Sequence, residues 1–421
     1  MKTDIVATVG WKCRNPESIE AMLKAGMNVA RLNMSYDENH EQTIGWIREA
    51  CQKLGVSCEI MLDTKGPEIR IGEMKDGKVN FNRDDIVTFT TKEGVVGDEQ
   101  TIPLSNLGIM RAAIKGGIFG IEDGQYGFEI LSRTSTETHT EVQARSLDNY
   151  TIYSNRNIWL PGYKREGEFL SEVDKKHLKL AVDNNLDSIA LSFVSSEADI
   201  LEAKQYIATL GGKCPEIIAK IETEEGVENI KSILGVCDGA MVARGDLGTE
   251  MSYERVPTAQ LRLLNACQKQ NKPCIVATGM MLSMKAEDSR IPTRAEASDV
   301  AFAAFFGANA IMLSGETVGN KYPEKPIAAA KMIIDAVELS KKESFKDMEE
   351  IINRVTPGVF EKIKEAVMGV LNWKGQSDEA GQNMFEGEKP SISERIKNAM
   401  GMGSQDDEQQ DDKGKPPRSL E

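Results

Sequence analysis

Short apolar runs, rich in β-branched residues, alternate along most of this chain with stretches that have apolar residues at helical spacing, such as 171–185 and 253–271. The runs are almost continuously apolar, which is typical of strands buried on both faces of a parallel sheet. Alternation of eight such strands with helices predicts an α/β protein with a closed (β/α)8 barrel rather than an open sheet. The eight predicted strands are 5–9, 28–33, 59–63, 188–193, 216–222, 239–244, 273–278 and 310–314.

One segment, residues 71–159, breaks this alternation. It has a period of two, as in "KVNFNRDDIVTFTT", with Gly and Asp between the runs, and we expect a small antiparallel, barrel-like β domain inserted after the third barrel strand. The barrel itself is then expected over 1–70 and 160–337. An insertion at this point would lie over the mouth where such barrels have their active sites, as a lid or as an inert addition.

Beyond the barrel, residues 338–375 predict a helical extension of two amphipathic helices around Thr356 and Pro357. Residues 376–421 are poor in apolar residues and acidic, so they are expected to be largely disordered. A short helix with Ser391 as N-cap is expected within this tail. It is either weak local order or a docking segment for an unknown protein partner.

Charge and cysteine usage narrow the class of protein. The formal net charge of −15 argues against nucleic acid and anionic membranes as partners. Seven scattered cysteines without CxxC spacing indicate reduced thiols rather than a disulfide framework or a zinc site. With no leader-like segment or membrane-spanning apolar stretch in the sequence, a cytoplasmic location is expected.

Chemically useful residues follow the fifth and sixth predicted strands. Lys220 and Glu222 are two residues apart, so their side chains leave the same face of the strand, and Arg244, Gly245 and Asp246 follow the next strand. Two carboxylates on neighbouring strands suit a Mg²⁺ ion that keeps positions for water and substrate. A cationic amine beside them would stabilise developing negative charge. The simpler alternative is a buried Lys–Glu ion pair without a ligand.

The second and third strands end in a different set of polar residues. Arg31 can hold a phosphate through two hydrogen bonds. The other side chains offer neutral or singly charged oxygens, which suit a monovalent cation better than a second divalent ion. Taken alone, they are better explained by hydrogen bonds that cap the strand ends. These oxygen donors are Asn33, Ser35, Asp63 and Thr64.

Six segments of the chain resemble, in order, the signature segments of the pyruvate kinase family. They are "VARLNMS", "LDTKGPEIR", "IIAKIETEEGV", "MVARGDLG", "PTRAEASDVA" and "IMLSGET". The resemblance covers about residues 1–337. It implies transfer of the phosphoryl group of phosphoenolpyruvate to ADP, giving pyruvate and ATP.

The resemblance implies a role for each matched residue near the substrate. Lys220 would stabilise the phosphoryl group and the enolate, and Glu222 and Asp246 would bind Mg²⁺ or Mn²⁺. Arg31 would hold the phosphate, and the backbone from Arg244 through Gly245 to Asp246 would receive the carboxylate. Thr278 would lie near the carbon that is protonated.

The resemblance also implies cation and nucleotide sites. Asn33, Ser35, Asp63 and Thr64 match the family's K⁺ ligands, and Glu68 matches a glutamate that accompanies K⁺ dependence. Arg70 matches an arginine for the nucleotide phosphates, and Arg156 stands where the family tends to have a lysine.

Departures from the family pattern gather on the nucleotide side. Gly10 is followed by Trp11, Lys12 and Cys13 instead of Pro-Ala-Ser, and Ser35 is followed by Tyr36 instead of His. Trp11 or Tyr36 could stack on a base, with Lys12 or Arg14 near phosphate, or Trp11 could simply pack. Glu122 and Gly279 replace an Asp and a Gln of the family, Phe302 replaces an Asn, and Asp123 and Gly124 are kept. The family's regulatory C-terminal domain is not recognisable.

These observations favour a catalytically active, unregulated pyruvate kinase or a relative with an altered phosphoryl acceptor. They leave open whether the chain is single or forms a homo-oligomer through the barrel. Two alternatives stay open. An enolate-handling lyase or aldolase would need only the intact half of the site, without ADP, and a repurposed scaffold would need little activity.

Overall fold

The computed structural model describes residues 2–355 apart from 37–38, 68, 105–106, 122–125, 161–162, 164–167, 287–288 and 290. Of residue 107 and of 342–355 only the backbone is described. The chain divides into two compact units, Met1–Glu338 and Leu339–Glu421. The predictions for Glu68, Glu122, Asp123 and Gly124, for the second helix of the extension and for the tail lie outside the described residues.

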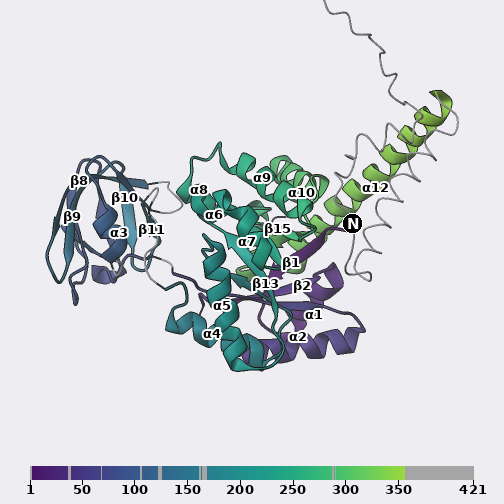
Figure 1. The fold of residues 1–421 in the computed structure, drawn as a ribbon, viewed down its shortest axis with the longest axis horizontal. Coiled ribbons are helices and arrows are strands. Elements are labelled where there is room, and N and C mark those ends of the chain that lie inside the picture. The colour runs from purple at the N-terminus through teal and green to yellow at the C-terminus, as the bar shows by residue number, and fades with distance from the viewer. Residues whose placement is uncertain are drawn as a thin grey trace, which may run out of the picture. The chain divides into compact units, whose positions relative to one another are not determined.

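Eight parallel strands close into a barrel, which confirms the predicted fold class (Figure 1). The strands run in the order β1-β16-β15-β14-β13-β12-β3-β2 around it. Several strands end one or two residues before the predicted limit. Phe193 and Thr278 explain two of these early ends, because each has a positive φ, of 57° and 71°, that no strand residue adopts. The strands are β1 (Asp4–Thr8), β2 (Val29–Asn33), β3 (Glu59–Asp63), β12 (Ser188–Leu191), β13 (Glu216–Ile221), β14 (Gly239–Ala243), β15 (Cys274–Ala277) and β16 (Ala310–Leu313).

The helices between the strands pack on the outside of the barrel (Figure 1). Their ends follow the capping rules. The first begins after Asn15, whose side chain accepts a hydrogen bond from Ser18 N–H, and ends at Gly26 in the left-handed region, with φ 113°. These helices are α1 (Pro16–Ala25), α2 (His40–Leu54), α4 (Glu172–Asp183), α5 (Glu197–Leu210), α6 (Glu224–Glu228), α7 (Ile230–Val236), α8 (Arg244–Glu250), α9 (Val256–Lys269) and α10 (Arg294–Phe305), with a 3₁₀ turn at Leu282–Lys285. Two further helices, α11 (Gly315–Val318) and α12 (Glu324–Val355), follow the last strand.

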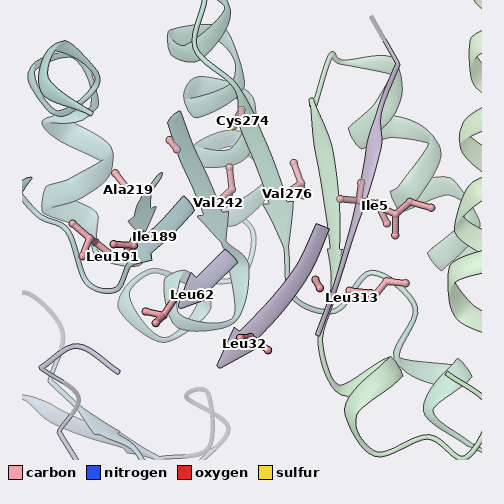
Figure 2. Packing of buried hydrophobic residues seen from close by; sticks show 14 of the residues in the cluster. Ile5, Leu32, Leu62, Ile189, Leu191, Ala219, Val242, Cys274, Val276 and Leu313 are labelled. Atoms are coloured by element: carbon pink, nitrogen blue, oxygen red, sulfur yellow. The ribbon is translucent and has the colours of Figure 1, made fainter. Parts of the chain in front are cut away.

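Both faces of the barrel strands are buried, as their continuous apolar pattern requires. The outward-facing side chains pack against the helices, and Figure 2 shows this layer. The residues labelled there are Ile5, Leu32, Leu62, Ile189, Leu191, Ala219, Val242, Cys274, Val276 and Leu313. The inward-facing side chains form a second cluster, which fills the barrel so that it has a packed interior and is not a pore. This inner cluster consists of Val6, Val29, Met61, Ala190, Ile218, Met241, Ile275, Ala277, Ala310 and Met312.

The insertion between β3 and α4 folds into two small sheets around its own core. The prediction of an antiparallel domain is correct for most strand pairs and wrong for one, because β5 and β6 pair in parallel. Residues 91–100 connect these two strands, which gives the chain room to return in the same direction. The elements are a 3₁₀ turn (Lys75–Gly77), β4 (Lys78–Phe81), β5 (Ile86–Thr90), β6 (Thr101–Pro103), α3 (Leu107–Ala112), β7 (Ile118–Ile121), β8 (Tyr126–Ser135), β9 (Thr140–Ser146), β10 (Tyr150–Tyr153) and β11 (Ile158–Trp159).

The last described helix, α12, continues past residue 337, where the sequence analysis placed the end of the barrel. Its sequence contains no Gly or Pro between Ile327 and Val355, so nothing interrupts the helix. It ends two residues before Pro357, which disfavours helical backbone at the preceding residue. Within the described part of the chain, no helix is both long and apolar enough to cross a membrane.

Candidate active site

A polar layer closes the inside of the barrel at the carboxyl ends of its strands. Alternate residues of a strand face the same side, so the residues two positions after the apolar inner cluster also point inward. On five neighbouring strands these residues are polar: Thr8, Arg31, Asp63, Ser192 and Lys220. On β14 and β15 the barrel lining ends in small residues, Ala243 and Ala277. The layer is therefore polar on one half and small on the other.

Lys220 is the centre of the polar half. Its side chain is buried, and Nζ lies 2.9 Å from Asp63 Oδ1 and 2.9 Å from Glu222 Oε1. Nζ also donates a hydrogen bond of 2.6 Å to Ser192 Oγ. Burial alone would lower the pKa of Lys220, but Asp63 and Glu222 raise it above its usual value. The amine is therefore a fixed cation and not a proton carrier at neutral pH.

Asp63 joins Lys220 to Arg31. Arg31 is buried, and its Nε donates to Asp63 Oδ2 at 2.6 Å while Nη1 donates to Thr8 Oγ1 at 2.9 Å. Burial alone would raise the pKa of Asp63, yet Arg31 and Lys220 hold it below its usual value. Two buried cations thus share one buried carboxylate, and a second carboxylate, Glu222, contacts the lysine.

The predicted Mg²⁺ ligands are Glu222 and Asp246. Glu222 is buried, and its Oε2 accepts the N–H of Phe193 at 2.5 Å while Oε1 faces Lys220. Asp246 lies in the first turn of α8 and is near enough to Lys220 to contribute to its raised pKa. Among the described residues, no group of three or more His, Cys, Asp or Glu side chains is placed to hold a metal ion. Two hard carboxylates fit a Mg²⁺ ion whose other ligands are substrate and water.

Arg244 ties the start of α8 to the end of β15. Its Nη2 donates to the carbonyl oxygen of Thr278 at 2.7 Å, and Nη1 contacts Asp299 Oδ1 at 2.7 Å. This bond holds Thr278 in a left-handed conformation, which is costly for a β-branched residue. The loop passes close to Gly245, where a Cβ atom would lie 2.8 Å from Thr278 Cγ2. A glycine at this position lets the two strand ends approach.

The four predicted K⁺ ligands lie at the ends of β2 and β3, and hydrogen bonds occupy several of their oxygens. Asn33 Oδ1 accepts the N–H of Ser35 at 3.0 Å, and Thr64 Oγ1 accepts the N–H of Ser192 at 3.0 Å. Such contacts are the strand-end capping that the sequence left open as an alternative. Each accepting oxygen keeps a second lone pair, so the donor set still fits a weakly bound monovalent cation. The K⁺ site stays a prediction.

The comparisons with known proteins agree with this geometry. The family model described as the barrel domain of pyruvate kinase matches residues 1–327. The chain belongs to the pyruvate kinase family. A pyruvate kinase from Staphylococcus saprophyticus is 37% identical over 339 residues, which cover 80% of this chain and 57% of that protein. Pyruvate kinase 2 from Trypanosoma brucei brucei is 38% identical over 79% of this chain and 66% of its own length.

A solved structure shares the fold as well. The crystal structure of a pyruvate kinase from Cryptosporidium parvum aligns with a TM-score of 0.74 and 35% identity, covering 80% of this chain and 69% of that one. The chain spans little more than half the length of the first of these pyruvate kinases, and the match ends near the end of the barrel. The predicted fold and family are confirmed.

Two residues predicted for the nucleotide side, Trp11 and Tyr36, are exposed, unlike the buried residues around Lys220. Trp11 is 61% exposed and Tyr36 is 45% exposed, on the loops after β1 and β2. The Lys12 amine lies 5.2 Å from the centre of the Trp11 ring. Arg70 donates to the carbonyl oxygen of Asn155 at 2.8 Å, whereas Arg156 lies over the Tyr153 ring. Their role in nucleotide binding stays a prediction.

The structure adds two residues that the sequence analysis missed. Ser192 and Thr8 each contact the charged residues, and the signal that could have found both is their position two residues after an inner apolar residue. A cavity of about 260 Å³ is lined on the barrel side by Asp246, Thr249 and Glu250. Burial, and less strongly Glu224, raises the pKa of Glu250 to about 7.

Proposed function

We propose that this chain transfers the phosphoryl group of phosphoenolpyruvate to ADP, giving pyruvate and ATP. One observation carries the proposal: the buried Lys220 amine, held as a cation by Asp63 and Glu222 at the carboxyl end of the barrel. Phosphoryl transfer needs little covalent chemistry from the protein and depends on positioning and electrostatic stabilisation. A fixed, preorganised cation supplies that stabilisation without rearranging during the reaction.

The substrate would lie between the polar and the small half of the layer. Lys220 and Arg31 provide positive charge for the phosphoryl group on the polar half. The backbone from Arg244 to Asp246 would receive the carboxylate on the other half. Thr278, whose backbone Arg244 holds in place, would direct a water to the enolate carbon for protonation.

Two cations belong to the proposal. Glu222 and Asp246 would hold Mg²⁺, or Mn²⁺, which would neutralise charge on the phosphoryl and enolate oxygens. Asn33, Ser35, Asp63 and Thr64 would hold K⁺. Around these ions the chain's own residues would bind and orient the substrate. Lys220 is buried, which keeps water away from its amine.

The acceptor of the phosphoryl group would be bound by a different set of residues. Trp11 and Tyr36 would contact the base of the nucleotide, and Arg70 and Arg156 its phosphates. A second candidate function is an enolate-handling lyase or aldolase, which would use Lys220, Glu222 and Asp246 without a nucleotide. It is favoured because the contacts within the buried half of the site do not involve the exposed residues.

An assay across acceptors separates these functions. Pyruvate formation from phosphoenolpyruvate is measured by coupling to lactate dehydrogenase, with Mg²⁺ and K⁺ and with ADP, GDP, UDP or no nucleotide. We expect turnover that requires a nucleoside diphosphate, Mg²⁺ and K⁺. We also expect hyperbolic kinetics without sugar-phosphate activation. Absence of pyruvate with every acceptor would overturn the kinase proposal. A parallel assay without nucleotide tests the lyase, which would be favoured by cleavage of an enolpyruvate or pyruvate-yielding substrate.

We also propose that the chain forms a homo-oligomer through its barrel. An exposed apolar surface supports this, since Phe302 is 60% and Phe305 59% exposed on α10. Light scattering after chromatography should show a mass above that of one chain, and Phe302→Asp should reduce it. A single-chain mass for the unaltered protein would contradict the proposal.

A cytoplasmic location completes the proposal. All seven cysteines are free thiols, and burial raises the pKa of Cys237 to about 11, so this thiol is unreactive. Immunofluorescence or fractionation of the native cell tests the location, and recovery in a membrane or organelle fraction would contradict it.

A further inference from the structure

Ser192 lies where β12 ends, between the Lys220 amine and the end of β3. Its side chain is buried and makes three polar contacts through one oxygen atom. Oγ lies 2.6 Å from Lys220 Nζ, 2.7 Å from the carbonyl oxygen of Thr64 and 3.2 Å from Asp63 Oδ1. No role in the reaction follows from the family motifs quoted above, because none of them includes this serine.

The chemistry of the hydroxyl group determines which bonds are made. A serine hydroxyl has one hydrogen to donate and two lone pairs. The lysine ammonium can only donate, so Ser192 Oγ accepts from Lys220 and gives its own hydrogen to the Thr64 carbonyl, which is the nearer acceptor. Chemistry therefore sets the direction of the Lys220 bond, and the shorter distance favours Thr64 over Asp63 as the acceptor of the serine hydrogen.

Lys220 has three ammonium hydrogens and three acceptors. Asp63 and Glu222 are two of them, each at 2.9 Å, and Ser192 is the third, at 2.6 Å. Three acceptors around one tetrahedral nitrogen leave the ammonium group no freedom to rotate. Without Ser192, the two carboxylates alone would define the position of Nζ.

The surroundings of Ser192 hold it rigidly. Its backbone N–H donates to Thr64 Oγ1 at 3.0 Å. Gly66, with φ 67°, passes so close that a Cβ atom there would lie 2.7 Å from Ser192 Cβ. Gly66 N–H is in turn bound to Asp174 Oδ1 at 3.0 Å. A side chain locked in this way transmits the position of the strand ends to the amine.

We propose that Ser192 is a positioning residue that fixes the Lys220 ammonium group for phosphoryl transfer. The inference rests on the proposed function and adds to it a residue outside the matched motifs. Ser192 acts through Lys220 and does not touch the substrate.

The first test compares Ser192→Ala with Ser188→Ala. Ser188 is a matched control, because it is a buried serine at the start of β12, the strand that Ser192 directly follows, and its hydroxyl makes no hydrogen bond to the described residues. Displacement of a catalytic group costs up to about 100-fold in rate, so we expect Ser192→Ala to lower kcat about 10- to 100-fold. Phosphoenolpyruvate binding, measured by calorimetry, should weaken less than about threefold, and Ser188→Ala should leave both values unchanged.

The second test repeats Ser192→Ala in a Lys220→Gln background and follows both residual turnover and urea unfolding. A residue that acts only through Lys220 has little further effect on turnover once the amine is gone. The shift in unfolding midpoint caused by Ser192→Ala should differ between the two backgrounds.

The outcomes separate the inference from the proposed function. If the unaltered protein forms no pyruvate, the proposed function fails, and the unfolding measurements still decide whether the two side chains are coupled. The inference is overturned if kcat of Ser192→Ala stays within twofold of that of the unaltered protein, or if Ser188→Ala lowers kcat as much. It is also overturned if the effects of Ser192→Ala and Lys220→Gln on the unfolding midpoint are additive.

Discussion

The buried end of the barrel and its exposed rim loops solve different physical problems. At the buried end, Lys220, Arg31 and their carboxylates satisfy one another without any ligand, at distances of 2.6–2.9 Å. On the rim, Trp11 and Tyr36 expose 61% and 45% of their surfaces. Buried ions need partners in the folded state, whereas exposed aromatic rings keep free surface that a bound molecule can cover.

We expect this difference to separate the residues that the fold itself holds in place from residues whose contacts depend on a ligand. Substitutions at the buried end should affect both folding and reaction. Substitutions on the rim should affect the reaction alone, and there only the step that uses the acceptor.

The largest effect is expected for Lys220→Ala and Asp246→Ala. Loss of one electrostatic partner of a transition state costs about 100- to 1000-fold in kcat, and loss of the central cation should reach at least the upper end of that range. Coupled turnover with phosphoenolpyruvate and ADP measures it. Lys179→Ala, which removes an exposed lysine of α4, is the control. Activity above one tenth in Lys220→Ala would show that the buried cation is structural only.

Asp63→Ala should cause the next largest effect, on stability. It leaves the buried Arg31 and Lys220 without their shared carboxylate, and breaking a buried ion pair costs about 3–5 kcal/mol. Asp183→Ala removes an exposed partner of Lys179 and should change the free energy of unfolding by less than about 1 kcal/mol. Urea unfolding of both variants checks the contrast, which is lost if they are equally stable.

The same contrast explains how far the sequence could predict this molecule. Continuous apolar runs identify the barrel strands because strands buried on both faces have apolar residues at nearly every position. The spacing of two between Lys220 and Glu222 predicts that their side chains share one face of a strand. Ser192 escaped prediction because a single serine at a strand end is chemically ordinary until the fold brings it to Lys220. The parallel β5–β6 pair escaped because alternation gives the face of a strand and not its direction.

Asp174 provides a smaller test, one step away from the buried ions. It caps α4 with Ser171 and accepts the N–H of Gly66, the residue that packs against Ser192. Burial alone would raise the pKa of Asp174, but the His177 ring, whose Nδ1 lies 3.9 Å from Oδ1, and hydrogen bonds from Ser171 and Gly66 hold it below its usual 3.8. Asp174→Asn should therefore cost about 1–2 kcal/mol of stability at pH 7.

The pH dependence of that difference has a definite sign. A carboxylate with a lowered folded pKa contributes its stability above the unfolded value, and the contribution is lost as the pH falls through the folded value. Unfolding of both proteins between pH 7 and pH 3 should show the difference constant above about pH 5 and shrinking below about pH 4. A difference that grows on acidification would contradict the assignment.

The smallest effects are expected on the rim. Trp11→Ala and Tyr36→Ala should raise KM for ADP about 3- to 10-fold, the equivalent of about 1 kcal/mol for a lost stacking contact. KM for phosphoenolpyruvate and the unfolding midpoint should not change, since both rings are exposed. If KM for ADP is also unchanged, the two aromatic residues have no part in binding the acceptor.

The most direct test of the central claim follows the phosphorus atom. Phosphoenolpyruvate and ADP are incubated with the protein, Mg²⁺ and K⁺, and ³¹P NMR is recorded together with pyruvate. We predict that the phosphoenolpyruvate signal is replaced by that of ATP, with one ATP formed for each pyruvate, and that Lys220→Ala abolishes the change. Pyruvate accompanied by inorganic phosphate instead of ATP, or no loss of phosphoenolpyruvate at all, would contradict phosphoryl transfer from this site.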